Sequence, residues 1–416
     1  MAAITEFEPA GASFEALYDF LALARRENPI FFSKKHNGWI VTRYDDLVAV
    51  VRSSNFTVEN ALKGAQSGQY CPEANGILNR GVDWNKTLHV QSDDGPNHTR
   101  FRKALMSVIT PKRIREMHPI VENLVTSLID KFIGKGECEF VSEFAFPLAM
   151  QTTLNLIGFK EAEDDMRKFP TWINDTFRML LANLTPAEQV QAATHAVEFQ
   201  DYIRAKIAAR KATPRNDLLS AILENLSSGA AKLTEDELII MMTHSFVGAG
   251  QETTKLALTN SMYHLLSRRD RWEELLFDRS RVPDFVEECL RFDAPLLAWY
   301  RYCAADTNIG GKLIRKGDLV VIVYGSANHD EARFSDADSF CPVHEKKSAH
   351  LTFNTGRHSC VGAPLARLEL NTALSALSAR IPGIRLRHNQ QIAYAPNFGN
   401  RDIPKLHLEW DINQGS

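Results

Sequence analysis

The residues best suited to chemistry surround one cysteine near the carboxyl-terminal end of the chain. Cys360 precedes an amphipathic run from Ala363, which predicts a helix with Pro364 in its first turn. Backbone N–H groups and the positive end of a helix dipole stabilise a thiolate, the form of cysteine that binds a metal. Gly356 and Gly362 let the backbone turn tightly and approach a flat cofactor. The pattern indicates a metal ligand, although an isolated cysteine is more often a buried core residue.

A long predicted helix carries the second group. Thr234 and Glu237 have the spacing of a capping box, and apolar residues continue from there past Leu256. Gly248 and Gly250 fall inside this helix, where each glycine costs about 1 kcal/mol relative to alanine. We interpret them as a place where the helix lies close to a cofactor and opens its hydrogen-bond ladder to oxygen or water.

The cysteine segment resembles the haem-binding signature of the cytochrome P450 superfamily, F-x-x-G-x-x-x-C-x-G. This family usually has glycine directly after the phenylalanine, where this chain has Asn354. The resemblance implies a mainly α fold with minor β sheets, a triangular helical prism around a buried haem. It also implies haem b as cofactor, with Cys360 as the iron ligand. The matched residues are Phe353, Gly356, Cys360 and Gly362.

The glycine helix resembles the oxygen-binding motif of the same family, A/G-G-x-D/E-T. By this resemblance Thr253 hydrogen-bonds dioxygen at the haem, and Glu252 relays protons from solvent. The same pair would also suit the polar face of an ordinary helix. Relatives that use peroxide tend to lack the pair, so it favours dioxygen and electrons. The matched residues are Ala249, Gly250, Glu252 and Thr253.

Four basic residues match positions that bind the haem propionates in the family. His98 and Arg102 are four residues apart, so on a helix they share a face and both reach one carboxylate. Arg301, in a strand-like segment, and His358 occupy the remaining positions by resemblance. Solvated surface cations are the alternative interpretation of all four.

The family's E-x-x-R motif, a structural ion pair near the haem loop, is matched by Glu288 and Arg291. An ordinary helical surface pair would have the same spacing. The family completes this triad with an arginine four residues after a phenylalanine. Here Phe340 is followed at that spacing by His344, a departure that puts the geometry of the triad in question.

Substrate pockets in this family are lined by variable segments, here residues 71 to 90, 169 to 181, 296 to 299 and the turn near 398. Their apolar and aromatic side chains favour a small or medium apolar substrate, aromatic or terpenoid. Core packing would explain the aromatic residues equally well. The pocket candidates are His244, Ser245, Gly248, Leu296, Leu297, Trp299 and Phe398.

A basic segment runs from Asn97 to Arg115, with six Lys or Arg residues and no acidic one. Further cations flank the cysteine loop, so a positive face could steer an acidic electron donor toward the haem. A solvated helix face is the alternative. The reductase domains of self-sufficient relatives are absent from this sequence, which implies a separate ferredoxin and ferredoxin reductase. The flanking cations are Lys346, Lys347, Arg357 and Arg367.

The elements that must position these residues are mainly helical. Two short strands are predicted between Pro29 and Thr42 around the turn at Asn37, and a long helical stretch from about 98 to 290. Strands return at 313 to 323 and 405 to 410, and residues 71 to 81 are predicted to be a surface loop. We expect one domain over 1–416, with a β-containing region at about 1–70 and a helical haem-binding body at about 71–416.

Composition sets the outer limits. The 416 residues are 44% hydrophobic and 24% charged, and the net charge is -3 at pH 7, so no nucleic-acid or membrane-surface partner is indicated. Six dispersed cysteines, with no CxxC pair, argue against a disulfide framework and favour the cytoplasm. The amino-terminal residues lack a long apolar run, so we expect a soluble protein without signal peptide or anchor. We also expect a monomer.

The resulting hypothesis is a haem monooxygenase, an oxidoreductase of the EC 1.14 type, that hydroxylates or O-dealkylates an apolar substrate with dioxygen. Alternatives on the same scaffold are a haem-thiolate peroxygenase, isomerase or dehydratase, or a non-catalytic haem protein. A zinc protein using Cys360, His350 and His358 is disfavoured, because the ligands are scattered.

Overall fold

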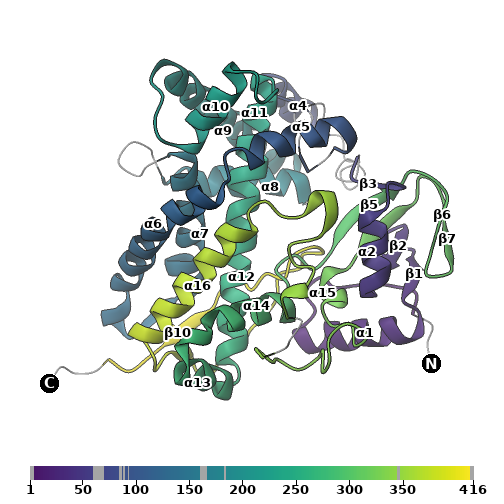
Figure 1. Cartoon of the computed structure of the whole chain (residues 1–416), viewed down its shortest axis with the longest axis vertical. Coiled ribbons are helices and arrows are strands. Elements are labelled where there is room, and N and C mark those ends of the chain that lie inside the picture. Colours follow the sequence, from purple (N-terminus) through teal and green to yellow (C-terminus); the bar gives the residue numbers. More distant parts are fainter. Residues whose placement is uncertain are drawn as a thin grey trace. The chain divides into compact units, whose positions relative to one another are not determined.

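A computed structural model of the chain describes residues 4–59, 70–83, 87, 90, 91, 93–159, 166–181, 184–343 and 347–412. The chain divides into two compact units, described separately below and coloured along the sequence in Figure 1. Unit 1 comprises Met1–Thr57, His118–Ala149 and Glu252–Ser416, and unit 2 comprises Val58–Met117 and Met150–Gln251. The helices α6 (Pro111–Asp130), α7 (Phe146–Ile157) and α12 (Ala249–Leu266) have residues in both units.

Unit 1 contains a five-stranded sheet in the order β1-β2-β8-β5-β3. Strands β1 (Ile30–Ser33) and β2 (Gly38–Val41) form the predicted hairpin, and Asn37 in its turn has φ 46°. Strand β2 pairs in parallel with β8 (Leu319–Ile322), and β8 pairs antiparallel with β5 (Trp299–Cys303), which in turn pairs antiparallel with β3 (Phe56–Thr57). In Figure 1 the helices α1 (Phe14–Glu27) and α2 (Tyr44–Arg52) are grouped with this sheet.

The remaining elements of unit 1 build its main apolar core. That core combines residues of α6, α12, α14 and α16 with the small sheet β4-β10-β9. Burial of these large apolar side chains stabilises the helices far more than their intrinsic propensity does. The elements are η1 (Ile133–Lys135), β4 (Glu137–Glu139), η2 (Val141–Ala145), α13 (Arg269–Phe277), η4 (Arg279–Arg281), α14 (Val282–Phe292), β6 (Thr307–Ile309), β7 (Lys312–Ile314), α15 (Tyr324–Ala327), η5 (Lys347–Ala349), η6 (Gly356–His358), α16 (Ala363–Arg380), β9 (Arg385–Leu386) and β10 (His407–Glu409).

Unit 2 is helical throughout its described part. The capping box predicted at Thr234 and Glu237 is confirmed, because the Thr234 side chain accepts from the Glu237 N–H and the Glu237 carboxylate accepts from the Thr234 N–H. A second capping box, of Thr185 and Glu188, begins the longest helix of the unit. The elements are α4 (Pro72–Leu78), α5 (Gly95–Met106), α8 (Phe169–Leu181), α9 (Pro186–Ala212), α10 (Leu218–Ser227), α11 (Glu235–Ile240) and the π-helix η3 (Met241–Gly248).

The mainly helical prediction with minor strands is confirmed. The predicted surface loop at residues 71 to 81 is wrong, since Pro72–Leu78 forms the helix α4. Pro72 occupies the first helical position, where its fixed φ suits a helix and its missing N–H has no intrahelical partner to lose. No helix among the described residues has the length and apolar character needed to cross a membrane.

Candidate active site

The cysteine loop of unit 1 lies between η6 and α16. Cys360 is exposed, and its backbone N–H donates to the carbonyl of Phe353 at 2.8 Å, which closes the loop on itself. Gly356 has φ +70°, a conformation that favours glycine. A Cβ atom at Gly362 would lie 3.8 Å from the Cys360 sulfur, so the backbone runs close to the thiol. The helix α16 begins at Ala363, as the sequence predicted, and its N-terminus therefore follows the cysteine directly.

Asn354, the departure from the family signature, adopts the conformation that glycine would take. Its φ is +58°, in the left-handed region that asparagine tolerates better than most residues. Its side-chain oxygen accepts from the Thr355 N–H at 2.7 Å, and its amide nitrogen donates to the His358 carbonyl at 3.4 Å. The substitution therefore preserves the turn and adds two local hydrogen bonds.

The predicted opening of the oxygen helix is present as a π-helix that ends at Gly248, two residues before Gly250. Residues Met241–Gly248 form a π-helix, and the N–H of Ala249 reaches the carbonyl of His244, five residues earlier. A π-bulge widens the ladder by one residue and is frequent at functional sites. Gly250 has a packing role as well, because a Cβ there would lie 3.0 Å from the hydroxyl oxygen of Thr153 on α7.

Glu252 is held by a partner that the motif does not include. The ammonium of Lys255 donates to a Glu252 carboxylate oxygen at 2.7 Å and lies 3.5 Å from an oxygen of Asp402. The Lys255 side chain is 11% exposed, and a buried ammonium is stable only when it is paired. Glu252 and Thr253 are adjacent in α12, within the part of that helix that belongs to unit 1.

Arg301 lies in strand β5, as predicted, and is 3% exposed. Among the described residues its partners are the carbonyl of Tyr300, at 2.7 Å, and the ring hydroxyl of Tyr324, and neither is a carboxylate. A buried guanidinium with only neutral partners is costly unless an anion completes its environment. The residue thus fits a cofactor that brings its own carboxylate, as haem does.

His98 and Arg102 both lie on α5 in unit 2, at the predicted spacing of four residues, and His98 is buried. The remaining predicted residues of unit 2, including Ala249 and Gly250, precede Glu252 on the oxygen helix. His244 is buried, and its Nδ1 lies 2.9 Å from the hydroxyl of Thr243. Because that hydroxyl donates to the Ile239 carbonyl, a neutral His244 donates from Nδ1.

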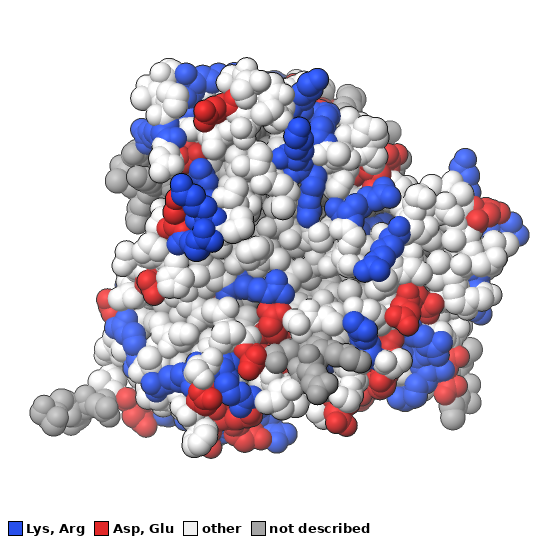
Figure 2. Space-filling view, viewed as in Figure 1, with Lys and Arg blue, Asp and Glu red and all other residues white. Residues whose placement is uncertain are grey.

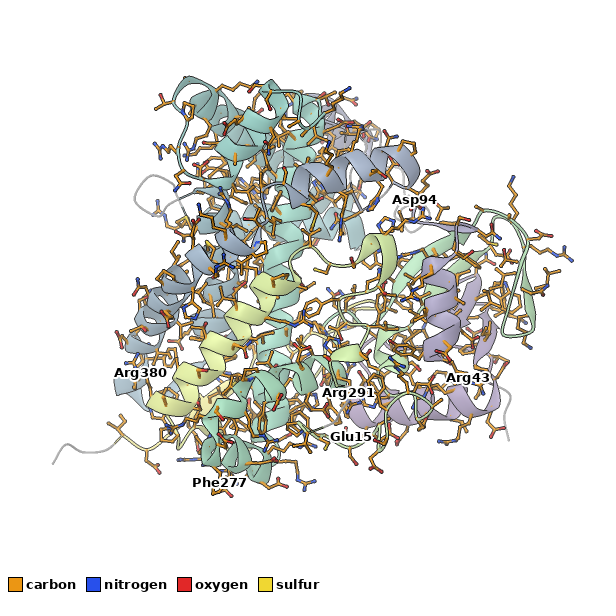
Figure 3. The ribbon with its side chains drawn as sticks, viewed as in Figure 1. Glu15, Arg43, Asp94, Phe277, Arg291 and Arg380 are labelled. Atoms are coloured by element: carbon orange, nitrogen blue, oxygen red, sulfur yellow. The ribbon has the colours of Figure 1, made fainter. Side chains whose placement is uncertain are left out.

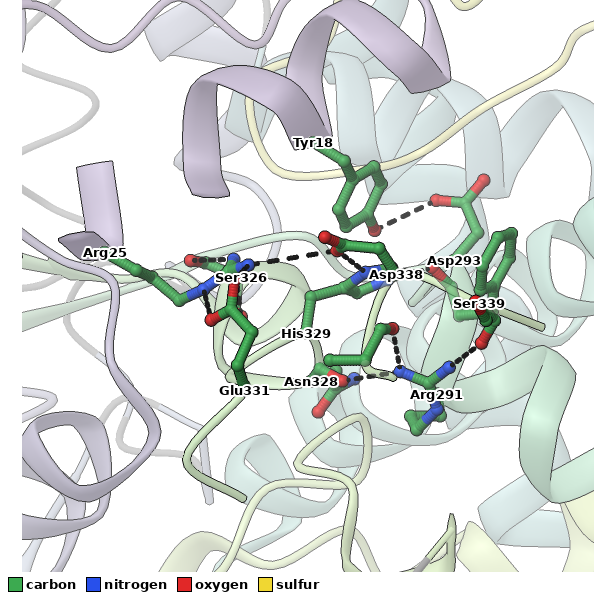
Figure 4. Close-up of polar contacts among 12 residues, drawn as sticks. Tyr18, Arg25, Arg291, Asp293, Ser326, Asn328, His329, Glu331, Asp338 and Ser339 are labelled. Carbon is green, nitrogen blue, oxygen red and sulfur yellow. Dashed lines mark hydrogen bonds and ion pairs between the residues drawn. The ribbon is translucent and has the colours of Figure 1, made fainter. Parts of the chain in front are cut away.

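The E-x-x-R pair is fully buried in unit 1. Figure 3 shows Arg291 deep among the side chains, and both Glu288 and Arg291 have exposed fractions of 0%. Two guanidinium nitrogens donate to the Glu288 carboxylate, each at 2.8 Å. The remaining donors reach backbone carbonyls, and Figure 4 shows the contacts of Arg291 with Asn328 and Ser339. The three carbonyl acceptors are Asn328 at 2.9 Å, Ala337 at 2.8 Å and Ser339 at 2.9 Å.

Backbone groups therefore complete the surroundings of this pair among the described residues. All five N–H donors of Arg291 have acceptors, and the N–H of Cys341 donates to Glu288 at 2.6 Å. His344, at which the family's third triad residue is expected, lies outside the described residues. The pair is thus a buried structural centre, and the alternative of a surface pair is wrong.

The pocket candidates of unit 1 make core contacts. Leu297 is 1% exposed, and Phe398 stacks on Tyr300 with ring centroids 5.5 Å apart and also contacts Phe7. Trp299 is partly buried at the start of strand β5, and Leu296 forms a bridge with Asn400. Packing is sufficient to explain Leu297 and Phe398. In unit 2, Ser245 donates to the side-chain oxygen of Gln91 at 3.3 Å, and Gly248 is buried.

The basic segment is less uniform than its sequence indicates. Figure 2 shows Lys and Arg side chains over α5 on the viewed face. Arg100, however, binds both carboxylate oxygens of Glu237, so its charge is neutralised within unit 2. Lys103, Lys112 and Arg115 are exposed. On the cysteine loop Arg357 is exposed, Arg367 is paired with Glu287, and nothing is described of Lys346 or of the Lys347 side chain.

Sequence reasoning missed two clusters that the fold assembles. The first is Glu252 with Lys255, one turn away on the same helix, and the Lys255 ammonium also lies near Asp402, which is 150 residues from Glu252 in the sequence. The spacing of three residues between Glu252 and Lys255 was a usable signal for an ion pair. The second cluster is Glu287 with His350 and Arg367, and no local pattern brings these three together.

Comparisons with known proteins agree with this geometry. The family model described as Cytochrome P450 matches residues 49–276 and 280–378. The chain is 33% identical over 367 residues to Cytochrome P450 107B1 of Saccharopolyspora erythraea, covering 87% of each chain. It is also 33% identical over 293 residues to the Steroid C26-monooxygenase of Mycobacterium tuberculosis, covering 70% of this chain and 77% of that one. The structure of the Tepidiphilus thermophilus P450 heme domain superposes with a TM-score of 0.91 at 28% identity, covering 99% of this chain and 98% of that one.

Family members bind haem b through a cysteine thiolate, take electrons from redox partners and bind dioxygen together with substrate. The residues of this chain fit that cofactor, since an exposed cysteine precedes a helix N-terminus and a buried arginine has no carboxylate among its described partners. The chain belongs to the cytochrome P450 family and is a haem b-dependent monooxygenase.

Proposed function

We propose that Cys360 supplies the thiolate that binds the haem iron. The observation that carries this proposal is the loop geometry: an exposed cysteine, closed onto Phe353 by its own N–H, directly before the N-terminus of α16. The helix dipole and the free N–H groups of that terminus favour the ionised sulfur. Arg301, His98, Arg102 and His358 bind the haem propionates. Phe353, Gly362, Ala249 and Gly250 contact the haem.

When bound, haem would supply the one-electron and oxygen chemistry, with Cys360 as the residue that would hold its iron. Thr253 holds a hydrogen bond to the oxygen substrate through its hydroxyl. Glu252, which accepts from Lys255 at 2.7 Å, accepts protons from the solvent side and passes them toward Thr253. The widened ladder of η3, ending at Gly248, gives this region backbone carbonyls that can bind water.

The proposed substrate is a small to medium apolar compound, aromatic or terpenoid, which is hydroxylated or O-dealkylated. The mycobacterial relative is named for oxidation of a steroid, a medium-sized apolar compound.

We propose that the electrons come from a ferredoxin and its reductase. The exposed cations Lys103, Lys112 and Arg115 would attract such an acidic donor. We further propose a monomer that forms one domain and works in the cytoplasm, consistent with six cysteines free of disulfides.

The reduced, carbon-monoxide-bound spectrum of the purified holoprotein tests the assignment of the ligand. We expect the strongly red-shifted Soret band of thiolate-bound haem. A folded, haem-loaded protein without that band would contradict the proposal.

Titration of the ferric protein with aromatics, terpenoids and fatty acids tests the substrate class. A spectral shift that saturates only with fatty acids would contradict the proposed class.

Thr253→Ala is expected to uncouple the reaction. Product formed per electron pair should fall roughly tenfold, the effect of about 1.4 kcal/mol on the productive step, because no hydroxyl remains to hold the hydrogen bond. The measurement compares reduced cofactor consumed with product formed on a substrate found in the titration. Thr253→Ser retains the hydroxyl and serves as the control. Equal coupling in the alanine and serine variants would contradict the role of Thr253.

A further inference from the structure

Glu287, which precedes the buried Glu288 on α14, contacts residues on both sides of the cysteine loop, namely His350 before it and Arg367 in α16. Its carboxylate accepts two hydrogen bonds from Arg367, from Nε at 2.5 Å and from Nη2 at 2.9 Å. The same carboxylate lies 3.4 Å from Nε2 of His350. His350 comes ten residues before Cys360 and Arg367 comes seven after it, so one carboxylate anchors the segment on both sides.

The His350 ring is oriented for this contact. Its Nδ1 accepts from the N–H of Thr352 at 3.3 Å, so the neutral ring carries its proton on Nε2, the nitrogen that faces Glu287. Burial lowers the pKa of His350, which is 1% exposed, and this keeps the ring neutral at physiological pH. His350 therefore lies against the carboxylate as a neutral ring whose Nε2 makes no hydrogen bond of good geometry, and the ion pair is the one with Arg367.

Phe353 connects this cluster to the cysteine. The Arg367 guanidinium lies 4.5 Å from the centroid of the Phe353 ring, and the His350 ring centroid lies 5.8 Å from it. A guanidinium over an aromatic ring and two tilted rings at this separation both attract. The carbonyl of Phe353 accepts the N–H of Cys360 at 2.8 Å. A continuous chain of contacts thus runs from Glu287 through Phe353 to the backbone of Cys360.

The electrostatics agree with a fixed carboxylate. Burial by itself raises the pKa of Glu287, which is 15% exposed, but the two hydrogen bonds and the charge of Arg367, together with the neighbouring His350 ring, outweigh it and lower the pKa to about 2. The group is therefore ionised at any pH at which the protein works. The charge of Arg367 is neutralised by Glu287. Arg367 therefore contributes little to the positive surface that is proposed to attract the electron donor.

We propose that Glu287 is a positioning residue for the iron ligand: through Arg367, His350 and Phe353 it fixes the backbone from which Cys360 presents its sulfur. This proposal rests on the proposed function, in which Cys360 binds the haem iron. The two adjacent glutamates of α14 then have different structural roles. Glu288 binds Arg291 and the segment that ends at Cys341, whereas Glu287 binds the cysteine loop.

The test measures the rate at which the thiolate-ligated haem is lost, and it does not depend on enzymatic activity. Glu287→Gln removes the ion pair and keeps the side-chain size, Arg367→Gln removes it with a shorter, neutral side chain, and Arg367→Lys keeps the charge but not the paired donors. Asp130→Asn is the matched control. It breaks an exposed ion pair between Asp130 and Arg380 at 2.5 Å, and Arg380 lies on α16, the helix that also carries Arg367. Each variant is purified with haem, and only preparations with wild-type far-UV dichroism and haem content are compared.

We expect the red-shifted Soret band of the reduced carbon-monoxide complex to decay about tenfold faster in Glu287→Gln and in Arg367→Gln than in wild type. Arg367→Lys should be intermediate, and the double glutamine variant no faster than either single variant, since both remove one link. The ferric/ferrous potential should shift in the same order, which lost stability alone would not cause.

Decay rates equal to that of Asp130→Asn would overturn the proposed positioning role while leaving the assignment of Cys360 intact. A wild-type protein without the red-shifted band would instead overturn the proposed function. Additive effects in the double variant would show that Glu287 and Arg367 act independently, and this would also overturn the proposal.

Discussion

Replacing Cys360 with histidine is expected to abolish the red-shifted Soret band and to lower monooxygenation by about 100-fold or more. A neutral imidazole binds haem iron but does not supply the electron density with which a thiolate favours O–O cleavage. The measurement is the reduced carbon-monoxide spectrum at equal haem content, followed by product analysis. Retention of the wild-type band in the histidine variant would rule out Cys360 as the ligand.

The other cysteines provide the controls. Burial raises the pKa of the Cys289 thiol to about 12 and also raises the pKa of Cys138, so neither thiol ionises readily at neutral pH. Cys303, whose pKa is also raised by burial, donates to the carbonyl of Ala305. Cys71→Ser should leave the spectrum unchanged, because the Cys71 thiol faces the carbonyl of Pro186 at 3.7 Å and its backbone N–H donates to the Gln189 side chain at 2.7 Å. A spectral change in that variant would implicate a second thiol.

Replacing Arg291 with methionine is expected to lower the free energy of unfolding by about 4 kcal/mol, enough to prevent recovery of holoprotein at growth temperature. The substitution leaves the Glu288 carboxylate buried without its countercharge and three backbone carbonyls without donors. Chemical denaturation followed by far-UV dichroism measures the loss in material purified at low temperature.

Two further variants define what this loss means. Arg268→Met removes an exposed pair, in which Arg268 and Asp270 are 65% and 66% exposed, and should cost less than about 1 kcal/mol. The double variant Glu288→Gln with Arg291→Met should be more stable than Arg291→Met alone, because the unpaired buried charge is gone. If Arg291→Met were no less stable than Arg268→Met, the buried pair would not be the structural centre described above.

Linear patterns in the sequence were sufficient for much of the site. The cysteine, its glycines and the following helix occupy eleven consecutive positions from Phe353 to Ala363, so their arrangement depends mainly on local backbone conformation. The capping box at Thr234 likewise placed the start of the oxygen helix correctly. The helix α4 was missed because proline was taken as a loop residue, although at a first helical position it favours a helix.

Asn354 and Gly250 show where local reasoning reached its limit. Asn354 stands where the family usually has glycine, yet asparagine takes the left-handed conformation and the turn is preserved. Gly250 was interpreted through the cofactor alone, whereas the direction its Cβ would take points at Thr153 of α7. A sequence shows that a residue is small, but only the packing shows which neighbouring residue leaves no room for a larger side chain.

The sequence by itself predicts the chemistry proposed here, with a thiolate before a helix at Cys360 and an acid and an alcohol at Glu252 and Thr253, and it correctly predicts a mainly helical chain. These features depend on contacts within a few turns, which spacing specifies. Only the tertiary structure determined which distant residues Glu287 and Lys255 contact. Glu287 meets residues 63 and 80 positions away, and Lys255 meets Asp402, because distant helix faces and loops pack together. Such pairings depend on the burial of the whole core, and no local spacing encodes them.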